Sequence, residues 1–466
     1  MKKTIFSRTA LFAVLLSICS LAGFAQNTPK AFGKTLTANP ENGKVRCVTT
    51  EYEEYLKQQF PNRETSEQFE AWLAPKIRAM QAQRLASPQS TNIVITIPVV
   101  VHVIHNGDAV GANENIADGQ VISQITVLNQ DFRRMEGTPG ENSDPVGADV
   151  EIEFCLAKRD PEGNATNGIN RVNLQLSSYD DELTIETYLK PSTQWDPDQY
   201  LNIWVCNFGG DMSDILGYAQ FPSGSGLNGI NNNGGLDYTD GVIIGYRYFG
   251  SKAIFPAGNN QFGYDRGRTT THEVGHYLGL RHINGDNTQA SSCTVNATDS
   301  NNDFCPDTPA TRFLNYECVY TDSCPGNGGP DMIENYMDYT PDACMNIFTQ
   351  NQKSRMLTVM NNATRRKLLK TSLGCVPPAL SSPEFELLNG INLYPNPATD
   401  VLNIAVANSE LPDSYVIYNN LGQTMANVKV NSDANLNVNT SNFSNGVYFI
   451  KVVKGNQTKT LKFIKK

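Results

Sequence analysis

Residues 271–282 read THEVGHYLGLRH, and this stretch decides how the central part of the chain folds. His272 and His276 are four residues apart, so on a helix both imidazoles project from the same face. Gly279 allows a sharp departure from that helix, because glycine tolerates the left-handed conformation of helix ends. The turn brings His282 towards the first two histidines. The stretch therefore predicts a helix and a turn that gather three imidazoles around one point.

The three imidazoles predict a zinc site. Three protein ligands leave the fourth position of a tetrahedral zinc open for water, as in catalytic sites. Glu273 lies beside the ligands, close enough to accept a proton from that water. The chain has only five histidines and three are here, so incidental histidines on a helix are a much weaker interpretation. Gly279 and His282 also argue against a thermolysin-type site with a distant glutamate ligand.

The flanking segments predict a mixed α/β (α+β) domain. Strands interleaved with helices are typical of such a unit, and we expect a mixed five-stranded sheet that carries the histidine helix. The expected strands lie at 93–101, 150–157, 201–208, 216–221 and 241–246, with a helix at 122–132.

Composition excludes several classes of protein. The 466 residues suggest about three folding units, and 39% hydrophobic residues rule out wholesale disorder. With 37 Lys and Arg against 47 Asp and Glu, the net charge of −10 argues against nucleic acid as the main partner. Beyond the N-terminus, no apolar run is long enough to span a bilayer, so no transmembrane segment is expected.

The first 25 residues predict a signal peptide. Basic residues precede an apolar stretch at 10–22, which has the length of a signal peptide rather than of a membrane span. Small residues place the cleavage after Ala25. A lipoprotein signal that uses Cys19 is the alternative, disfavoured by the preceding Ile18. Either signal takes the mature chain into an oxidising compartment, where disulfides persist.

The cysteines predict a loop region that is crosslinked by disulfides, and one free thiol. Of ten cysteines, Cys19 is removed with the signal peptide, and nine remain. Because nine is an odd number, at least one thiol is expected to stay unpaired within the chain and to have a function. Cys47 is isolated far upstream and is the obvious candidate. Four cysteines crowd a loop-rich stretch between residues 293 and 324. The cysteines after Cys47 are Cys155, Cys206, Cys293, Cys305, Cys318, Cys324, Cys344 and Cys375.

The chain divides at changes of pattern. Apolar residues at helical spacing over 64–85 mark a small helical pro-segment, assigned to residues 26–90. The main domain spans 91–375, and a Pro- and Ser-rich linker spans 376–384. In 385–466, short alternating runs between Asn, Gly and Ser turns predict an all-β sandwich.

The histidine motif resembles that of the metzincin metalloproteases at all of its fixed positions. Met337, in the run NYMDY at 335–339, fits the methionine-bearing turn that metzincins need beneath the metal. The run DTP at 307–309, the cysteine-rich loop and the approach to Cys344 narrow the resemblance to the pappalysin-like branch, of cytophagalysin or ulilysin type. The resemblance covers about residues 93–375. It implies a secreted zinc endopeptidase made as a latent zymogen.

The resemblance also implies roles for single residues. Glu273 would be the general base, and the Tyr339 hydroxyl would stabilise the oxyanion, with simple packing as the alternative for Tyr339. Asp303 and Thr308 resemble calcium ligands, although the polarity of an exposed loop explains them equally well. Asp342 would line the pocket for the residue after the scissile bond and favour Arg or Lys there.

Disulfide pairs follow from the same resemblance. It pairs Cys293 with Cys324 and Cys318 with Cys344. The partners of the other four cysteines stay open: Cys155, Cys206, Cys305 and Cys375.

One further expectation concerns the strand that binds the substrate, and another concerns the two histidines outside the motif. An extended protein or peptide substrate is expected to pair with an exposed edge strand at 216–221. His102 and His105 are three apart on a strand and face opposite sides, so we expect structural roles rather than metal binding.

Latency is expected to involve Cys47. In some metzincin zymogens a pro-segment cysteine thiolate caps the zinc, and pappalysin-like members show a similar Arg-Cys signature, here Arg46-Cys47. Val48 stands where the signature has glycine. A stray or intermolecular cysteine is the alternative. The pro-segment is expected to end between residues 84 and 92.

The tail resembles the C-terminal sorting domain of type IX secretion substrates of Bacteroidetes. The resemblance rests on the run LYPNPATD at 393–400, on GVY at 446–448 and on the final Lys465-Lys466. It implies the type IX secretion machinery as a partner and an extracellular or cell-surface location reached through the periplasm. A carbohydrate-binding sandwich is the alternative for the tail. For the whole chain the competing class is a non-catalytic, zinc-stabilised surface adhesin, which would not need Glu273.

Overall fold

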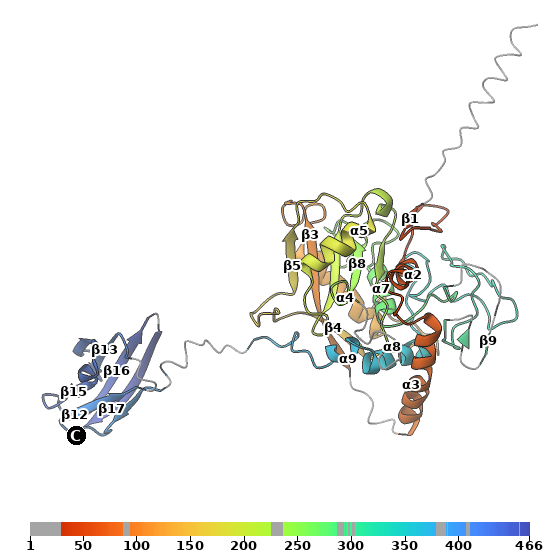
Figure 1. Ribbon diagram of the computed structural model, residues 1–466. Helices are drawn as coiled ribbons and strands as arrows, with labels where there is room; N and C mark the ends of the chain where they lie inside the picture. Colours follow the sequence, from red (N-terminus) through yellow and green to blue (C-terminus); the bar gives the residue numbers. More distant parts are fainter. Residues whose placement is uncertain are drawn as a thin grey trace, which may run out of the picture. The chain divides into compact units, whose positions relative to one another are not determined.

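The structure is a computed structural model of the chain. It describes residues 29–86, 94–224, 236–286, 293, 295–296, 299–300, 303–378, 388, 390–406, 411–455 and 457–466. The chain forms two compact units, a first unit up to Pro377 and a second unit from Pro378 onward (Figure 1). The expected signal peptide, the pro-segment end after residue 86 and the linker from residue 379 lie outside the described residues. Among the described helices, none combines the length and hydrophobicity that a bilayer span requires.

A mixed sheet forms the centre of the first unit (Figure 1). Its strands follow the order β4-β3-β6-β8-β7, with β5 also paired to β3. Only the β7–β8 pair is antiparallel; the others are parallel. The strands are β3 (Ile95–His105), β4 (Ile152–Leu156), β5 (Ile169–Asn173), β6 (Leu201–Cys206), β7 (Gly217–Ala219) and β8 (Val242–Gly245).

The sheet has six strands rather than the expected five. β4 pairs with residues 95–99 of β3, and β5 pairs with residues 101–105 along the same edge. The sheet is therefore five positions wide, with two short strands in one position. β5 has the sequence INRVN and is only half-buried, so it lacks the apolar pattern that identifies a strand.

The hydrophobic core explains where the helices pack. Alternate residues of β3, such as Val99 and Val101, face a core that also contains Phe132 of α4, Val274 of α7 and Met337. The helices of the first unit are α2 (Thr49–Gln59), α3 (Ser66–Ala86), α4 (Asp118–Phe132), α5 (Glu182–Thr184), α6 (Lys190–Thr193), α7 (Arg268–Tyr277), α8 (Gln350–Asn362) and α9 (Arg366–Leu369). Short turns of other helix types are η1 (Ile185–Leu189), η2 (Gly210–Met212) and η3 (Tyr246–Tyr248).

Residues 29–86, called the N-terminal segment, belong to the first unit. Besides α2 and α3 this segment contains the small hairpin of β1 (Lys30–Ala31) and β2 (Lys34–Thr35). Its Val48 and Tyr52 share a second hydrophobic core with Trp204, Tyr218 and Ile243 of the sheet. The segment and the rest of the first unit, residues 94–377, which we call the sheet domain, thus bury a common core.

Among the described residues of the first unit, three pairs of cysteines form disulfides. The structure joins Cys293 to Cys324 and Cys318 to Cys344, the pairs that the resemblance implies. It also joins Cys155 to Cys375, which ties β4 to the end of the unit. Cys47, Cys206 and Cys305 are buried free thiols. Near the cysteine-rich loop lies a minimal hairpin of β9 (Val295–Asn296) and β10 (Asp299–Ser300).

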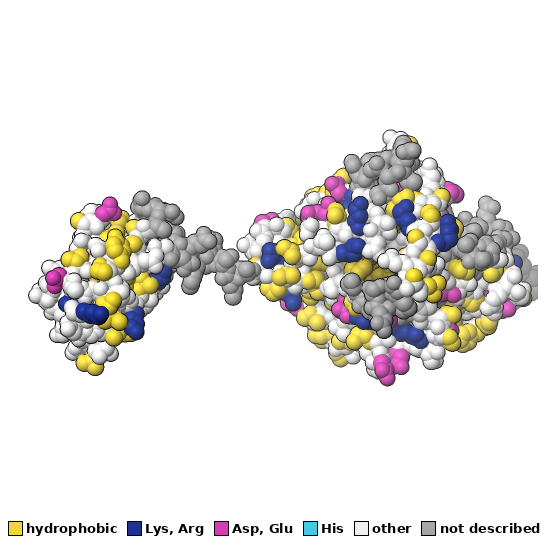
Figure 2. All heavy atoms as spheres, turned by 90° about the horizontal axis from the view of Figure 1, so that it is seen from below, with side chains coloured by type: hydrophobic (Ala, Val, Ile, Leu, Met, Phe, Trp, Pro, Cys, Tyr) yellow, Lys and Arg dark blue, Asp and Glu magenta, His cyan; other side chains and the backbone are white. Residues whose placement is uncertain are grey.

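The second unit is the predicted all-β sandwich. One sheet has the order β11-β12-β15 and the other β14-β13-β16-β17. Side chains of both sheets, including Leu402, Ile417, Ile450 and Phe463, form its own core. The face of the second unit that Figure 2 shows carries hydrophobic side chains and a group of lysines. The elements are β11 (Asn392–Tyr394), β12 (Val401–Ala405), β13 (Ser414–Asn419), β14 (Thr424–Lys429), η5 (Asp433–Leu436), β15 (Asn437–Asn439), β16 (Gly446–Lys454) and β17 (Gln457–Lys465).

Candidate metal centre

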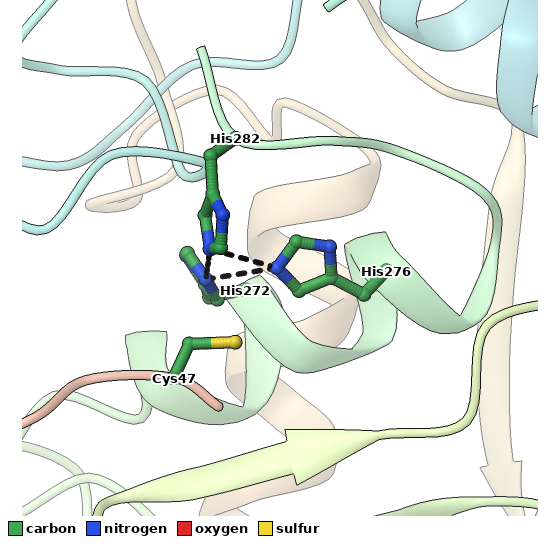
Figure 3. A group of neighbouring side chains, drawn as sticks. All are labelled: Cys47, His272, His276 and His282. Atoms are coloured by element: carbon green, nitrogen blue, oxygen red, sulfur yellow. Dashed lines mark hydrogen bonds between the residues drawn. The ribbon is translucent and has the colours of Figure 1, made fainter. Parts of the chain in front are cut away.

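Helix α7 and the turn after it bring three histidines together. His272 and His276 lie on consecutive turns of α7, all of whose residues are buried. Gly279 has a φ of +91°, in the left-handed region, and the chain turns there towards His282. A side chain at Gly279 would also collide with Val359, because a Cβ would lie 2.8 Å from its Cγ2. The expected helix, turn and convergence are all present (Figure 3).

The Nε2 atoms of the three imidazoles face one point. His272 Nε2 lies 3.2 Å from that of His276 and 3.1 Å from that of His282, and the last two are 3.0 Å apart. Zinc–nitrogen bonds of the usual length would hold tetrahedral ligands about 3.3 Å apart. The observed triangle is thus close to the size that a zinc ion requires.

The opposite ring nitrogens show that these Nε2 atoms carry lone pairs. Nδ1 of His272 donates to the carbonyl of Tyr336 at 2.7 Å, and Nδ1 of His276 donates to the carbonyl of Leu280 at 2.8 Å. Nδ1 of His282 bonds the carboxylate of Asp286. With the protons on Nδ1, the converging Nε2 atoms are acceptors that repel one another unless a cation lies between them. The residues therefore fit a divalent metal.

Burial keeps two of the imidazoles neutral. It lowers the pKa of His272 well below the usual value and that of His276 to about 3. Burial also opposes the charged form of His282, but the Asp286 carboxylate raises the pKa of His282 overall. Neutral imidazole is the form that binds a metal.

Cys47 of the N-terminal segment supplies a fourth donor atom. Its Sγ and one nitrogen from each histidine all lie within 4.8 Å of one another, and all four residues are buried (Figure 3). The Thr49 backbone N–H donates to this sulfur at 3.3 Å, and the Tyr339 hydroxyl donates to the Cys47 carbonyl at 3.0 Å. These contacts hold the thiol at the open side of the histidine triangle.

Glu273 lies beside the same triangle. Its Oε2 accepts hydrogen bonds from the Thr49 hydroxyl at 2.9 Å and from Cys47 Sγ at 3.4 Å. Its Oε1 is buried and has no hydrogen-bond partner among the described residues. Burial raises the pKa of Glu273 to about 7, so the group is poised to exchange a proton near neutral pH.

Met337 packs directly on α7. Its Sδ lies 2.5 Å from the place where a Cβ on Gly275 would stand, so the helix needs glycine there. The neighbouring Tyr336 carbonyl is the one that orients His272. Met337 thus packs against the helix that carries His272 and His276, and its assignment to a Met-turn stays a prediction.

Asp342 binds an arginine of the N-terminal segment. Arg46 donates from Nη2 to Asp342 Oδ1 at 3.0 Å and to the Thr340 carbonyl at 2.7 Å, with both charged side chains buried. The second oxygen of Asp342 accepts the backbone N–H groups of Arg266 and Arg268 at the start of α7. The carboxylate is thus fixed and turned towards a guanidinium.

The N-terminal segment covers the edge of β7 that does not pair with β8. The Leu216 N–H donates to the Val45 carbonyl, and the Val48 N–H donates to the Gly217 carbonyl. Further along, Ala219 N–H donates to the Thr49 hydroxyl. At Phe221, Glu53 accepts the N–H and Arg63 donates to the carbonyl. The edge expected to receive a substrate is therefore occupied by this segment.

The other expected site residues lie apart from the histidines. Thr308 donates to Asp303, whose other oxygen accepts the Cys305 N–H. Calcium at this pair stays a prediction. His102 is buried between Asn202 and Asn170, and burial lowers its pKa to about 4, consistent with a structural role.

Several residues of the site carry no motif in the sequence that predicts them. Asp286 orients His282, and Thr49 binds Glu273, but neither belongs to a motif. The spacing of Asp286, four residues after His282, is the one local signal that could have identified it. The contact between Arg46 and Asp342 joins residues 296 positions apart, which no local pattern reveals.

Comparisons with known proteins show which families the two units resemble. The family model described as pregnancy-associated plasma protein-A matches residues 188–361. The model described as secretion system C-terminal sorting domain matches residues 392–466. An extracellular metalloprotease of Verticillium alfalfae is 32% identical over 282 residues, which cover 60% of this chain and 81% of the relative. One of Colletotrichum graminicola is 30% identical over 291 residues, which cover 60% and 84%.

Two solved structures from Tannerella forsythia are also similar. Mature mirolysin in complex with a cleaved peptide is 40% identical with a TM-score of 0.50, over 59% of this chain and 96% of that one. A promirolysin mutant is 38% identical with a TM-score of 0.50, over 64% and 91%.

Proposed function

The chain belongs to the pappalysin-like family of extracellular metalloproteases, and from this premise we propose which of its residues bind the zinc, cleave the peptide bond and keep the enzyme latent. The sorting domain assigns the protein to the outside of the cell, secreted or attached to the surface. The observation that carries the proposal is the triangle of three Nε2 acceptors beside the buried carboxylate of Glu273.

We assign His272, His276 and His282 as the zinc ligands. Their Nδ1 partners fix each ring so that its Nε2 lone pair points to the centre. Bound there, zinc would supply an electrophile that polarises the scissile carbonyl and acidifies a water molecule.

Glu273 is the general base, and Tyr339 stabilises the oxyanion. Glu273 takes the proton from the attacking water and delivers it to the leaving amine, a role that its raised pKa suits. The Tyr339 hydroxyl, which here donates to the Cys47 carbonyl, would donate to the substrate carbonyl once the N-terminal segment has left.

The N-terminal segment is the pro-segment, and Cys47 blocks the metal. A thiolate is a good zinc ligand, so Cys47 would take the position that water needs. The bound segment also covers the edge of β7 and fills the site at Asp342. Latency therefore depends on the metal, the carboxylate of Glu273 and the substrate-binding edge together.

The substrate is an extended protein segment with Arg or Lys after the scissile bond. Once the segment is released, the edge from Leu216 to Phe221 offers free N–H and C=O groups to an extended chain. Asp342 then lacks its arginine, and an Arg or Lys side chain of the substrate would replace Arg46.

Cleavage profiling of proteome-derived peptides tests the proposal. The activated wild type should cut before Arg or Lys, and Glu273→Ala should lose cleavage by at least about a hundredfold while it keeps its zinc. Equal cleavage by both proteins would refute the role of Glu273. Zinc binding without cleavage by the wild type would favour an adhesin, which the comparisons do not support.

A further inference from the structure

One carboxylate of helix α3 binds two arginines of the sheet domain. Arg355 of α8 donates to both oxygens of Glu70, from Nη1 to Oε2 at 2.6 Å. Arg281 donates from Nε to Oε1 of the same carboxylate at 3.0 Å. The exposed fractions are 1% for the Arg355 side chain and 9% for Glu70. Two-pronged contact of this kind is how arginine recognises carboxylates.

The two guanidinium groups are positioned by the sheet domain itself. Arg355 Nε donates to the Gly279 carbonyl at 2.5 Å, in the turn that leads to His282. Arg281 lies over the ring of Phe221 at 5.0 Å and over that of Phe304 at 5.9 Å. Its Nη1 also lies 3.6 Å from Asp286. None of these contacts involves α3, so they do not depend on it. Departure of α3 would remove the Glu70 carboxylate together with Phe69, whose ring packs on Phe221 and lies near Arg355.

The arginine pair lies beside the path that a substrate would follow. A cavity of about 490 Å³ under the N-terminal segment is lined by His276, Arg281, Phe221 and Phe304, among others. The cavity therefore reaches from the metal ligand His276 to Arg281, one arginine of the pair. A chain bound along the edge of β7 can place a side chain in it.

The path of the N-terminal segment shows on which side of the scissile bond the arginine pair lies. Its Arg46 lies at Asp342, Cys47 at the histidines and Thr49 at Ala219. Beyond them, Glu53 lies at Phe221. A substrate with its residue after the scissile bond at Asp342 must therefore extend its preceding residues towards Phe221.

We propose that Arg281 and Arg355 bind the carboxylate of an acidic substrate residue located three to five positions before the scissile bond. The inference rests on the proposed endopeptidase function and on removal of the N-terminal segment. Phe221 is four residues beyond Gly217, where the segment crosses the metal site, and paired strands advance in step at about 3.3 Å per residue. Preferred substrates then carry Glu or Asp upstream and Arg or Lys after the bond.

Peptide kinetics with enzyme activated from the full chain test this inference. Peptides with Arg after the scissile bond would carry Glu, Gln or Lys at one upstream position at a time. At one of the three positions, Glu should exceed Gln about tenfold in kcat/KM, chiefly through KM, and Lys should be worse than Gln. The preference should weaken at high salt, because the site is open to solvent once α3 has left.

Variants of the two arginines show which residues bind the acidic side chain of the substrate. In Arg281→Gln and Arg355→Gln the ratio of Glu to Gln should fall towards one, and Arg281→Lys should retain part of it. Arg133→Gln, which removes a half-buried arginine that pairs with Asp149 and Glu153 away from the metal centre, is the matched control and should keep the full ratio. If an arginine variant does not fold, the salt dependence of the wild-type series decides.

Two results would overturn the inference, and they differ from failure of the proposed function. Equal kcat/KM for Glu and Gln at all three positions contradicts it, as does a ratio that both arginine substitutions leave unchanged. In either case the peptides are still cut, so the endopeptidase function stands. Absence of any Glu273-dependent cleavage would overturn both proposals.

Discussion

In the sequence the N-terminal segment precedes the sheet domain and the second unit follows it, and the two differ in how they build their cores. The N-terminal segment shares a core with the sheet and inserts buried charged and polar groups into the metal centre. The second unit buries Ile417, Ile450 and Phe463 in a core of its own. The first can therefore control the metal centre directly. The second unit has a core that forms from its own residues alone.

Deletion of residues 385–466 should give the largest effect and affect only secretion. Because the second unit has its own core, the sheet domain should fold and melt as before. The truncated protein should accumulate in the periplasm almost completely, as fractionation and immunoblotting of cells and medium would show. Normal release into the medium would contradict the role of the sorting domain, and a lower melting temperature of the first unit would break the contrast between the two regions.

Cys47→Ala should have the next largest effect, on latency. Loss of a metal–thiolate bond opens the fourth position to water, so we expect roughly a hundredfold faster appearance of peptidase activity. The measurement is the time course of cleavage of a peptide with Arg after the scissile bond. Cys206→Ala, which removes a buried thiol away from the histidines, is the matched control. Unchanged activation kinetics in Cys47→Ala would show that the thiol is not the block.

Replacement of Arg46 should have a smaller effect. Arg46→Ala breaks a buried, charge-assisted contact with Asp342, and we expect about tenfold faster activation. Arg84→Ala removes a more exposed ion pair of the same segment, with Glu151, and should change the rate by less than about threefold. Equal effects of the two substitutions would mean that Asp342 does not contribute specifically to latency.

Local patterns predicted one class of feature well. Helix α7, its turn at Gly279, most of the strands and the sandwich of the second unit follow from periodicity and turn residues within short windows. These patterns do not predict the strand β5, because its residues are only half-buried and form no apolar pattern.

Contacts between distant residues could not be predicted in the same way. The pair of Glu70 with Arg355 and that of Arg46 with Asp342 are separated by more than 280 residues, and nothing in either local sequence marks the partner. Local sequence does not pair Cys155 with Cys375 for the same reason. These contacts arise only when the N-terminal segment and the sheet domain fold on each other.

The most direct test of the account is zinc X-ray absorption on the latent full chain, with metal content measured in parallel. We expect one zinc per chain with three nitrogen ligands at about 2.0 Å and one sulfur ligand at about 2.3 Å. In Cys47→Ala the sulfur contribution should disappear while the nitrogens remain. A latent protein that binds no zinc, or one whose zinc lacks the three imidazole ligands, would contradict the account.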